Sequence, residues 1–161
     1  MEQENSVLSE LASGIGKASS PRSEVVEKGA IRRFINALSD QNPLYEDDEF
    51  AGKSRYGGKI APPLFALTFN RRRRPQPDPV LAELGMSGLN AGNEFEFFEP
   101  IREGDVITHT TKLIDVKERT GKLGRMFIRT NETICTNQNG KKVAVCRWIT
   151  IAHEGGPKGE S

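Results

Sequence analysis

The sequence predicts one α+β domain, in which two helices precede an antiparallel sheet. Apolar residues from Ile31 to Leu38 recur at the spacing of one helix face. From Ala91 onward, apolar and polar residues alternate with a period of two, which is typical of strands. The pair Asn139-Gly140 separates two such stretches and predicts a hairpin turn. Helices followed by a run of strands are the pattern of an α+β fold.

The first helix is expected to begin near Glu27. It should end within the sequence DQNP, because Pro43 disfavours the helical conformation for Asn42. Its amphipathic pattern requires a buried face, so we expect this helix to pack on the inner face of the sheet. The flexible pair Gly57-Gly58 follows in a loop.

Pro62-Pro63 opens a second apolar stretch, and proline is well placed in the first turn of a helix. Residues 63–71 are therefore predicted to form a short buried helix. An irregular connection with three further prolines leads to the sheet. Four strands are expected within residues 92–101, 104–121, 122–140 and 141–153.

Length and charge restrict the class of protein. The chain has 161 residues, enough for one domain, and its 23 basic and 22 acidic side chains leave a formal charge of +1. This balance argues against nucleic acid as a partner. The sequence has neither an apolar run of membrane-spanning length nor a secretory signal pattern. We expect a cytoplasmic protein.

The two ends of the chain are polar. Residues 1–23 are rich in Ser, Gly and Glu, and residues 154–161 offer nothing to bury. We therefore expect a flexible N-terminal segment over 1–23, a folded domain over 24–153 and a flexible tail over 154–161. Cys135 and Cys146 lack metal-ligand spacing, and in a reducing compartment they are expected to be buried free thiols.

Several stretches, in order, resemble one known family. They are SDQNPLYEDDEFA, YGGKIAPPLF, FFEPIREGDVI and ERTGKLGRMFIRTNETI. Together they are similar to the MaoC-like (R)-specific enoyl-CoA hydratases and 3-hydroxyacyl dehydratases, above all to the N-terminal-type dehydratase region of fatty-acid synthase 1. The resemblance runs from about Glu24 to His153. It implies a hot-dog fold, paired units, and an acyl thioester of coenzyme A or acyl carrier protein as substrate, with no other cofactor and no metal.

Catalytic members of this family carry the motif Gly/Ser-Asp-x-Asn-Pro-x-His-x-Asp. By this resemblance Asp40 stands at the catalytic aspartate, Asn42 and Pro43 at Asn-Pro, and Asp47 at the last aspartate. Tyr45 stands at the histidine. Adding water to an unsaturated thioester needs a base that activates the water and an acid that protonates the neighbouring carbon. Tyrosine, with an ordinary pKa near 10, is a poor base at neutral pH, although it can orient water or donate a proton.

A second departure from the family pattern lies at Pro62-Pro63. Catalytic relatives read Ile-Ala-His-Gly where this chain reads Ile-Ala-Pro-Pro. The resemblance implies that the glycine N–H binds the thioester oxygen, and Pro63 has no N–H. Losing one such donor typically costs a factor of about 100 or more in rate. Asp40 and Tyr45 are thus the candidate catalytic pair of an altered site.

Candidate substrate-binding positions follow from the resemblance and from the residue types, and several have a simpler alternative. Arginine binds phosphate in a bidentate manner, so the Arg71–Arg74 run is a candidate clamp for coenzyme A; the alternative is a solvated helix end. Tyr45 can be a polar group in the pocket or an aromatic filler, and Asn42 can serve only to organise a turn. His109 and His153 are expected to be ordinary strand residues. The substrate-binding candidates are Asn42, Gly57, Gly58, Lys59, Pro63, Arg71 and Arg72.

Three functions remain open from the sequence. The first is an acyl-binding hot-dog subunit that forms a heterodimer with a MaoC-like catalytic subunit carrying an intact Asp/His pair. The second is a homodimer that is a self-sufficient hydratase and uses Asp40. The third is an acyl-CoA-binding protein without activity.

Overall fold

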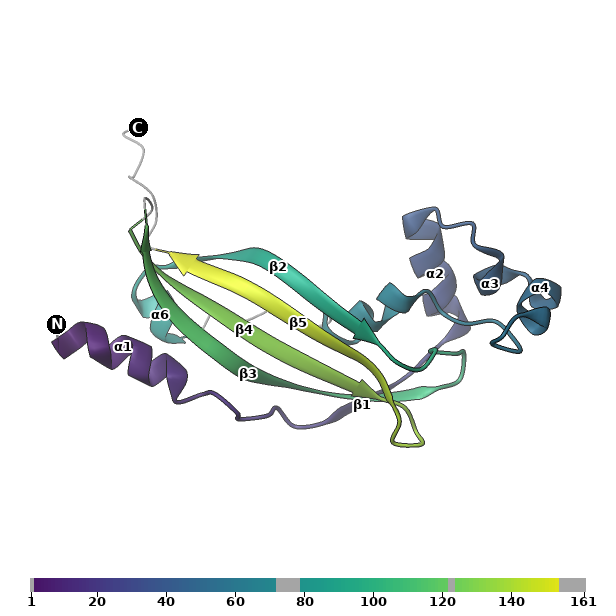
Figure 1. The fold of residues 1–161 in the computed structure, drawn as a ribbon, viewed down its shortest axis with the longest axis horizontal. Helices are drawn as coiled ribbons and strands as arrows, with labels where there is room; N and C mark the ends of the chain where they lie inside the picture. The colour runs from purple at the N-terminus through teal and green to yellow at the C-terminus, as the bar shows by residue number, and fades with distance from the viewer. Residues whose placement is uncertain (1, 72–78, 122–123, 154–161) are drawn as a thin grey trace.

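The computed structural model describes residues 2–71, 79–121 and 124–153. Five strands form one antiparallel sheet in the order β1-β3-β4-β5-β2, and the long strands curve along their length (Figure 1). The strands are β1 (Arg22–Val25), β2 (Ser87–Phe97), β3 (Val106–Gly121), β4 (Gly124–Thr136) and β5 (Lys142–His153). The helices are α1 (Glu2–Ala12), α2 (Lys28–Leu38), α3 (Pro43–Glu46), α4 (Asp48–Lys53), the 3-10 helix η1 (Pro63–Leu67), α5 (Thr68–Arg71) and α6 (Pro79–Glu83).

The predicted α+β class and hot-dog fold are confirmed, and the four expected strands are β2 to β5. The predicted turn at Asn139-Gly140 joins β4 to β5, where the Gly140 N–H donates to the Asn137 carbonyl at 2.9 Å. The short edge strand β1 was not predicted. It pairs with the start of β3, with Val25 opposite Val106 and Arg22 opposite His109.

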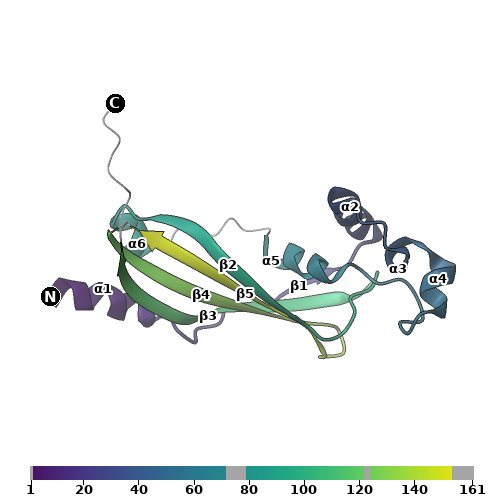
Figure 2. The ribbon, with the colours of Figure 1, turned by 45° about the horizontal axis from the view of Figure 1, so that its top comes forward.

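Two apolar cores hold the helices to the sheet. The larger core joins η1, α5 and α2 to β3, β4 and β5, and its centre includes Phe65, Phe69 and Ile107. The smaller core lies at the opposite end of the sheet, where Leu11 of α1 and Leu81 of α6 meet Phe127 of β4. Figure 2 shows the same division, with α1 and α6 at one end of the sheet and α2, α3 and α4 at the other.

The helix that covers the inner face of the sheet is not the predicted one. Phe69 of α5 stacks near His109 of β3, with ring centroids 6.4 Å apart, so the segment 63–71 lies on the sheet. α2 instead lies beyond the strand ends (Figure 1) and reaches this segment through Phe34 and Phe65, whose rings are 5.6 Å apart. The short connection from β1 to α2 explains why α2 lies there. β1 ends at Val25, beside the beginning of β3, so a helix that starts at Lys28 must begin at that end of the sheet.

The N-terminal segment also differs from the expectation. Residues 2–12 form α1, whose Leu11 is buried in the smaller core with Val7 and Leu8 packed around it. The following chain runs along β3, where the Ser19 N–H donates to the Thr111 carbonyl at 2.8 Å. The apolar face of α1 is short, but it packs in the same core as Phe127. The composition of residues 1–23 does not reveal this contact. The predicted tail, 154–161, lies outside the described residues.

Both cysteines are buried free thiols, as predicted. Burial, with a smaller contribution from Cys146, raises the pKa of Cys135 to about 12, and burial raises the pKa of Cys146 to about 11. Among the described residues, no helix combines the length and apolar character that crossing a membrane requires.

Candidate active site

The candidate site begins where α2 ends. Ser39 adopts a left-handed conformation with φ of 52°, and the Asp40 N–H donates to the Ile35 carbonyl at 3.3 Å. The Asp40 carboxylate turns back and accepts the Asn42 N–H at 3.1 Å. This half-buried carboxylate is therefore fixed by the turn that ends the helix.

Asn42 organises the next turn. Its side-chain oxygen accepts the Leu44 N–H at 3.0 Å and caps α3, with Pro43 at the first helical position. Asp47 caps the next helix in the same way: its side chain accepts the Phe50 N–H at 2.9 Å at the start of α4. Side-chain caps of this kind are typical of Asn and Asp. Two of the motif residues thus shape the backbone around Tyr45.

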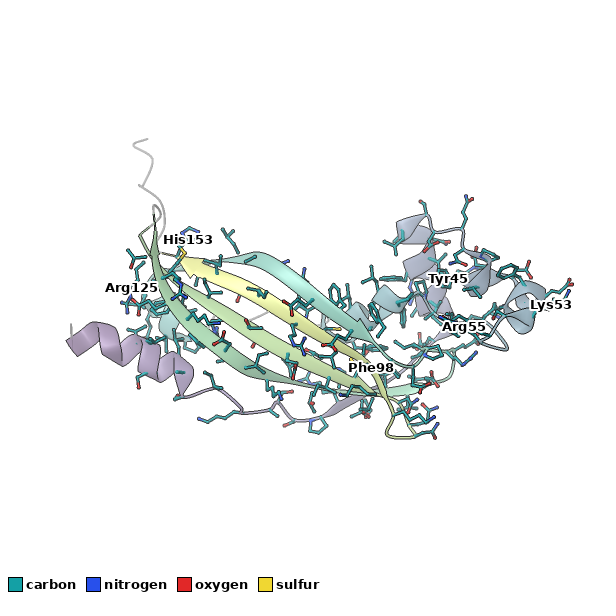
Figure 3. All side chains as sticks on the ribbon, in the orientation of Figure 1. Tyr45, Lys53, Arg55, Phe98, Arg125 and His153 are labelled. Atoms are coloured by element: carbon teal, nitrogen blue, oxygen red, sulfur yellow. The ribbon has the colours of Figure 1, made fainter. Side chains whose placement is uncertain are left out.

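Tyr45 is a residue of α3, in the helical region beyond the strands (Figure 3), and packs against the larger core. Burial raises the pKa of the Tyr45 phenol, and the negative charges of Asp40 and, when ionised, Tyr56 raise it further, while a hydrogen bond from Asn42 opposes them. The phenol therefore stays protonated at neutral pH. It can donate a proton or a hydrogen bond, but it cannot act as a general base.

A cavity of about 360 Å³ opens beside Tyr45. Its floor is apolar and comes from Ile31, Ile35 and Ile60, and its rim carries both cations and carboxylates. The full lining is Lys28, Ile31, Arg32, Ile35, Tyr45, Glu46, Lys59, Ile60 and Glu103. The structure thus brings together two of the predicted site residues, Tyr45 and Lys59, while Asp40 does not line this cavity.

The loop that carries Gly57 and Gly58 is held by an arginine from the turn between β2 and β3. The Arg102 guanidinium donates to the Tyr56 carbonyl at 2.5 Å and to the Lys59 carbonyl at 3.3 Å. Between these two anchors Gly57 and Gly58 have φ of 63° and 156°, which favour glycine. The glycines thus make the turn, and Arg102 fixes its two ends.

Of the predicted cationic site residues, the structure describes the side chain of Lys59 but not those of the arginines. The Lys59 ammonium forms an ion pair with Asp48 at 2.7 Å, so it meets a carboxylate of its own chain. Arg71 is the last residue of α5. Arg72, like Arg73 and Arg74, lies outside the described residues, as does the Arg71 side chain.

Pro63 is the first residue of η1, and Pro62 caps it. The Phe65 N–H donates to the Pro62 carbonyl at 2.8 Å, so the backbone turns into the helix directly at the two prolines. At the position of the family's glycine, the chain therefore has a helix start without an N–H on Pro63.

Neither of the two histidines is placed at this site. His109 is buried on β3, where its Nε2 lies 3.7 Å from a Glu24 carboxylate oxygen and its ring faces Phe69. His153 ends β5 at the far end of the sheet from Tyr45 (Figure 3). The segment from Asp40 to Pro63 contains no histidine.

Sequence reasoning missed Arg102 and two cations of the cavity rim, Lys28 and Arg32. Arg102 lies in a stretch that reads only as a turn, and its two acceptors are 43 and 46 residues away along the chain. Lys28 and Arg32 are four residues apart on α2, so they share one face, which was an available signal. Only the position of the loop 54–60 places that face at a cavity.

A family profile matches this chain over most of its length. The profile is described as the FAS1-like dehydratase domain region, and residues 13–146 match it. The chain belongs to this family. The similarity of this FAS1-like dehydratase chain to the MaoC-like hydratases and dehydratases is thereby confirmed.

Curated relatives of this FAS1-like dehydratase chain include UPF0336 proteins and a probable hydratase subunit. A UPF0336 protein of Thermobifida fusca is 36% identical over 104 residues, which are 63% of this chain and 68% of the relative. A UPF0336 protein of Saccharopolyspora erythraea is 32% identical over 137 residues, which are 81% of this chain and 86% of the relative. A probable enoyl-CoA hydratase alpha subunit of Thermomonospora curvata is 30% identical over 134 residues, but this chain spans only 42% of its length.

Solved structures share the fold at low sequence identity. The ChsH1-ChsH2 complex from Mycobacterium tuberculosis superposes with a TM-score of 0.82 at 19% identity, over 99% of this chain and 96% of that chain. The HadBC complex of the same organism, described as a 3R-hydroxyacyl-ACP dehydratase, gives a TM-score of 0.67 at 21% identity, over 86% and 96% of the two chains. The (R)-hydratase PhaJ1 from Pseudomonas aeruginosa gives 0.64 at 18% identity, over 87% and 82%. At these identities the likeness establishes the hot-dog fold of the FAS1-like dehydratase chain.

Proposed function

We propose that this chain is the acyl-thioester-binding subunit of an (R)-specific enoyl-CoA hydratase or 3-hydroxyacyl dehydratase. Its partner is a MaoC-like hot-dog chain that carries an intact Asp/His pair. The observation that carries this proposal is the state of the altered motif: Asp40 is held in its turn, and Tyr45 is a protonated phenol where the family has its base.

The backbone at Pro63 supports the same division of labour. A hydratase stabilises the charge that develops on the thioester oxygen, usually with N–H donors at a helix start. In this chain the helix start is formed by two prolines. The partner therefore supplies both the base and the N–H donor, and this chain contributes the binding surface.

The cavity at Tyr45 suits the thioester arm. Its floor of three isoleucines matches the apolar parts of a pantetheine chain, and its rim can hydrogen-bond amide groups. The names of relatives agree with an unequal pair, since one is an alpha subunit and two structural neighbours are complexes of different chains.

Hydration of a short enoyl-CoA tests the proposal. Loss of the conjugated thioester's absorbance is followed for the purified chain alone and together with a MaoC-like chain that carries the intact motif. Binding of the same enoyl-CoA is measured in parallel by calorimetry. We expect binding by the chain alone, turnover only with the partner, and little effect of Asp40→Asn on that turnover. Asp115→Asn controls for a change of charge, because this half-buried residue of β3 pairs with Lys117 at 2.6 Å and does not line the cavity.

One alternative is favoured by a specific observation. Asp40 retains its carboxylate, and its negative charge raises the pKa of the Tyr45 phenol, so the two groups interact electrostatically. Turnover by the chain alone that Asp40→Asn abolishes would overturn the partner-dependent proposal and establish a self-sufficient hydratase. Binding without turnover under both conditions would instead indicate a non-catalytic acyl-CoA-binding protein.

A further inference from the structure

Polar side chains separate the two apolar cores on the inner face of the sheet. Along β5, Cys146 belongs to the larger core and Ala152 to the smaller core. Successive side chains of a strand point to opposite faces, so Trp148 and Thr150 lie on the inner face between these two residues. The covered face of the sheet is therefore not apolar along its whole length.

The neighbouring strands supply polar side chains at the same level. Asn131 of β4 and Asn93 of β2 are the register partners of Trp148, and side chains directly opposite each other share a face. Arg129 follows on the same face of β4, opposite Thr150. We call these five residues the polar band: Asn93, Arg129, Asn131, Trp148 and Thr150.

The hydrogen-bonding groups of Trp148 and the two asparagines are open to a ligand. The Trp148 Nε1 is buried and has no hydrogen-bond partner in the part of the chain that the structure describes. Within the same part, the side-chain amides of Asn93 and Asn131 make no hydrogen bond, and these residues are exposed and half-buried. An indole N–H is a donor only, so the group that Trp148 lacks is an acceptor.

A strip of aromatic rings leads to the polar band. β2 runs toward the end of the sheet that carries α2 (Figure 1), and Phe97 is its last residue. The rings of Phe97 and Phe95 are stacked with centroids 6.2 Å apart, and Phe95 meets Trp148 edge to face at 6.4 Å. Phe97 is 45% exposed, so the strip is open at its outer end.

The strip starts near the cavity described above. Tyr45, which lines that cavity, and Phe95 of the strip both pack against the larger core. From Phe97 to Asn93 the strip spans roughly 13 Å, because an extended strand rises about 3.3 Å per residue. A ligand that follows the strip from this end thus meets apolar rings first and hydrogen-bond donors afterwards.

We propose that the aromatic strip and the polar band bind an acyl chain that carries a hydroxyl or carbonyl oxygen remote from its thioester. The rings take the hydrocarbon part, and the remote oxygen accepts the Trp148 N–H. An unsubstituted chain of the same length leaves this buried N–H without a partner, so the site disfavours it. This inference rests on the proposed function, because it names the acyl group of the thioester that the chain binds.

Matched pairs of ligands test the selectivity. Octanoyl-, decanoyl- and dodecanoyl-CoA, and the ω-hydroxy counterpart of each, are titrated into the full chain by calorimetry. At one length or more, the ω-hydroxy ligand should bind about tenfold more tightly than its counterpart, as one hydrogen bond to a buried donor predicts. Trp148 is the single tryptophan, so its emission should change with the ω-hydroxy ligand and much less with the unsubstituted one.

Three variants locate the selectivity. Trp148→Phe keeps an aromatic ring but removes the N–H, so it should abolish the preference by weakening the ω-hydroxy ligand alone. Asn131→Leu makes the band more apolar and should shift the preference toward the unsubstituted ligand. Asn36→Leu makes the same change at an exposed position of α2 and should keep the wild-type preference.

The comparison of ligands on the wild-type chain does not depend on how well a variant folds. Equal affinity for the two ligands at every length would overturn the inference and leave the proposed function standing. A preference that Trp148→Phe leaves intact would also overturn it. Binding of neither series would overturn the proposed function, and this inference with it.

Discussion

The sheet with its inner helix and the segment from Asp40 to Ile60 are stabilised by different interactions. On the sheet, Phe65, Ile107 and Cys135 are buried in one continuous core. In the segment, Ala51 is buried, whereas Phe50 is 51% exposed and the helices α3 and α4 span only four and six residues. Hydrogen bonds define the segment: the Asn42 and Asp47 caps and the two bonds from Arg102.

Because of this difference, the residues that stabilise the fold are largely separate from those of the candidate site. Residues that pack in the core fix the fold, and a change there costs several kcal/mol. The candidate site lies where local hydrogen bonds hold the backbone, so its residues can change at small cost to the fold. An altered motif such as Asp40–Tyr45 can therefore persist on an intact hot-dog scaffold.

The largest expected effect comes from Phe65, which lies in the core of the first region. Its ring meets Phe34 of α2 and Phe69 of α5 edge to face, at 5.6 and 5.7 Å. Phe65→Ala should lower the free energy of unfolding by about 3–5 kcal/mol, because it leaves a cavity between helix and sheet. Urea denaturation followed by the fluorescence of the single tryptophan measures it.

Phe50→Ala is the matched control, because it removes the same ring from an exposed position on α4. Its free energy of unfolding should stay within about 0.5 kcal/mol of wild type. Equal losses at the two positions would mean that the segment is packed as tightly as the core, and the contrast between the regions would be wrong.

The sequence predicted the elements better than their packing. Period-two alternation gave the four long strands, and the Ile31–Leu38 spacing gave α2. Both α2 and the 63–71 segment carry an apolar face, and periodicity does not say which of them reaches the sheet. That choice depends on the short strand β1, which fixes where α2 begins. α1 was missed for a similar reason, since Leu11 is buried in a cluster with residues that are distant in sequence, such as Leu81 of α6 and Phe127 of β4.

The site was predictable only through its local motif. Asp40 and Asn42 bond within two residues of themselves, and such contacts are visible in a short stretch of sequence. Arg102 acts over more than forty residues, and the cavity rim combines α2, α3, the loop 54–60 and the β2–β3 turn. These depend on the folded arrangement, which no spacing rule encodes.

A medium effect is expected at Arg102. Arg102→Met keeps the apolar stem but removes both hydrogen bonds to the loop, and it should cost about 1–2 kcal/mol of unfolding free energy. Enoyl-CoA binding should weaken as well, because Lys59 and Ile60 line the cavity. Arg102→Lys should not restore binding, since one ammonium cannot reproduce the two-pronged contact.

Arg55→Met provides the comparison for Arg102. Arg55 lies in the same loop but is exposed and contacts the Tyr56 side chain, with its guanidinium 2.6 Å from the hydroxyl. Its replacement should leave unfolding and binding near wild type. If both variants lose binding to the same extent, the positive charge of the loop is what matters, and the anchoring role of Arg102 is refuted.

The smallest effect is a titration at Tyr45. Burial and the Asp40 charge raise the pKa of its phenol above the ordinary value near 10. The chain has two tyrosines, so the tyrosinate absorbance of wild type minus that of Tyr45→Phe isolates this group. We expect the midpoint of the Tyr45 titration above pH 10.

The same pKa shift predicts a dependence of stability on pH. The folded state favours the protonated phenol of Tyr45, so the contribution of this group to stability is complete below pH 10 and is lost as the pH rises through the raised pKa. Urea denaturation of the two proteins across that range should show wild type losing more stability than Tyr45→Phe. A midpoint at pH 10 would mean that the site leaves the phenol pKa unchanged. A midpoint below pH 10 would mean that the site stabilises the phenolate, and Tyr45 would then be a candidate base in a self-sufficient enzyme.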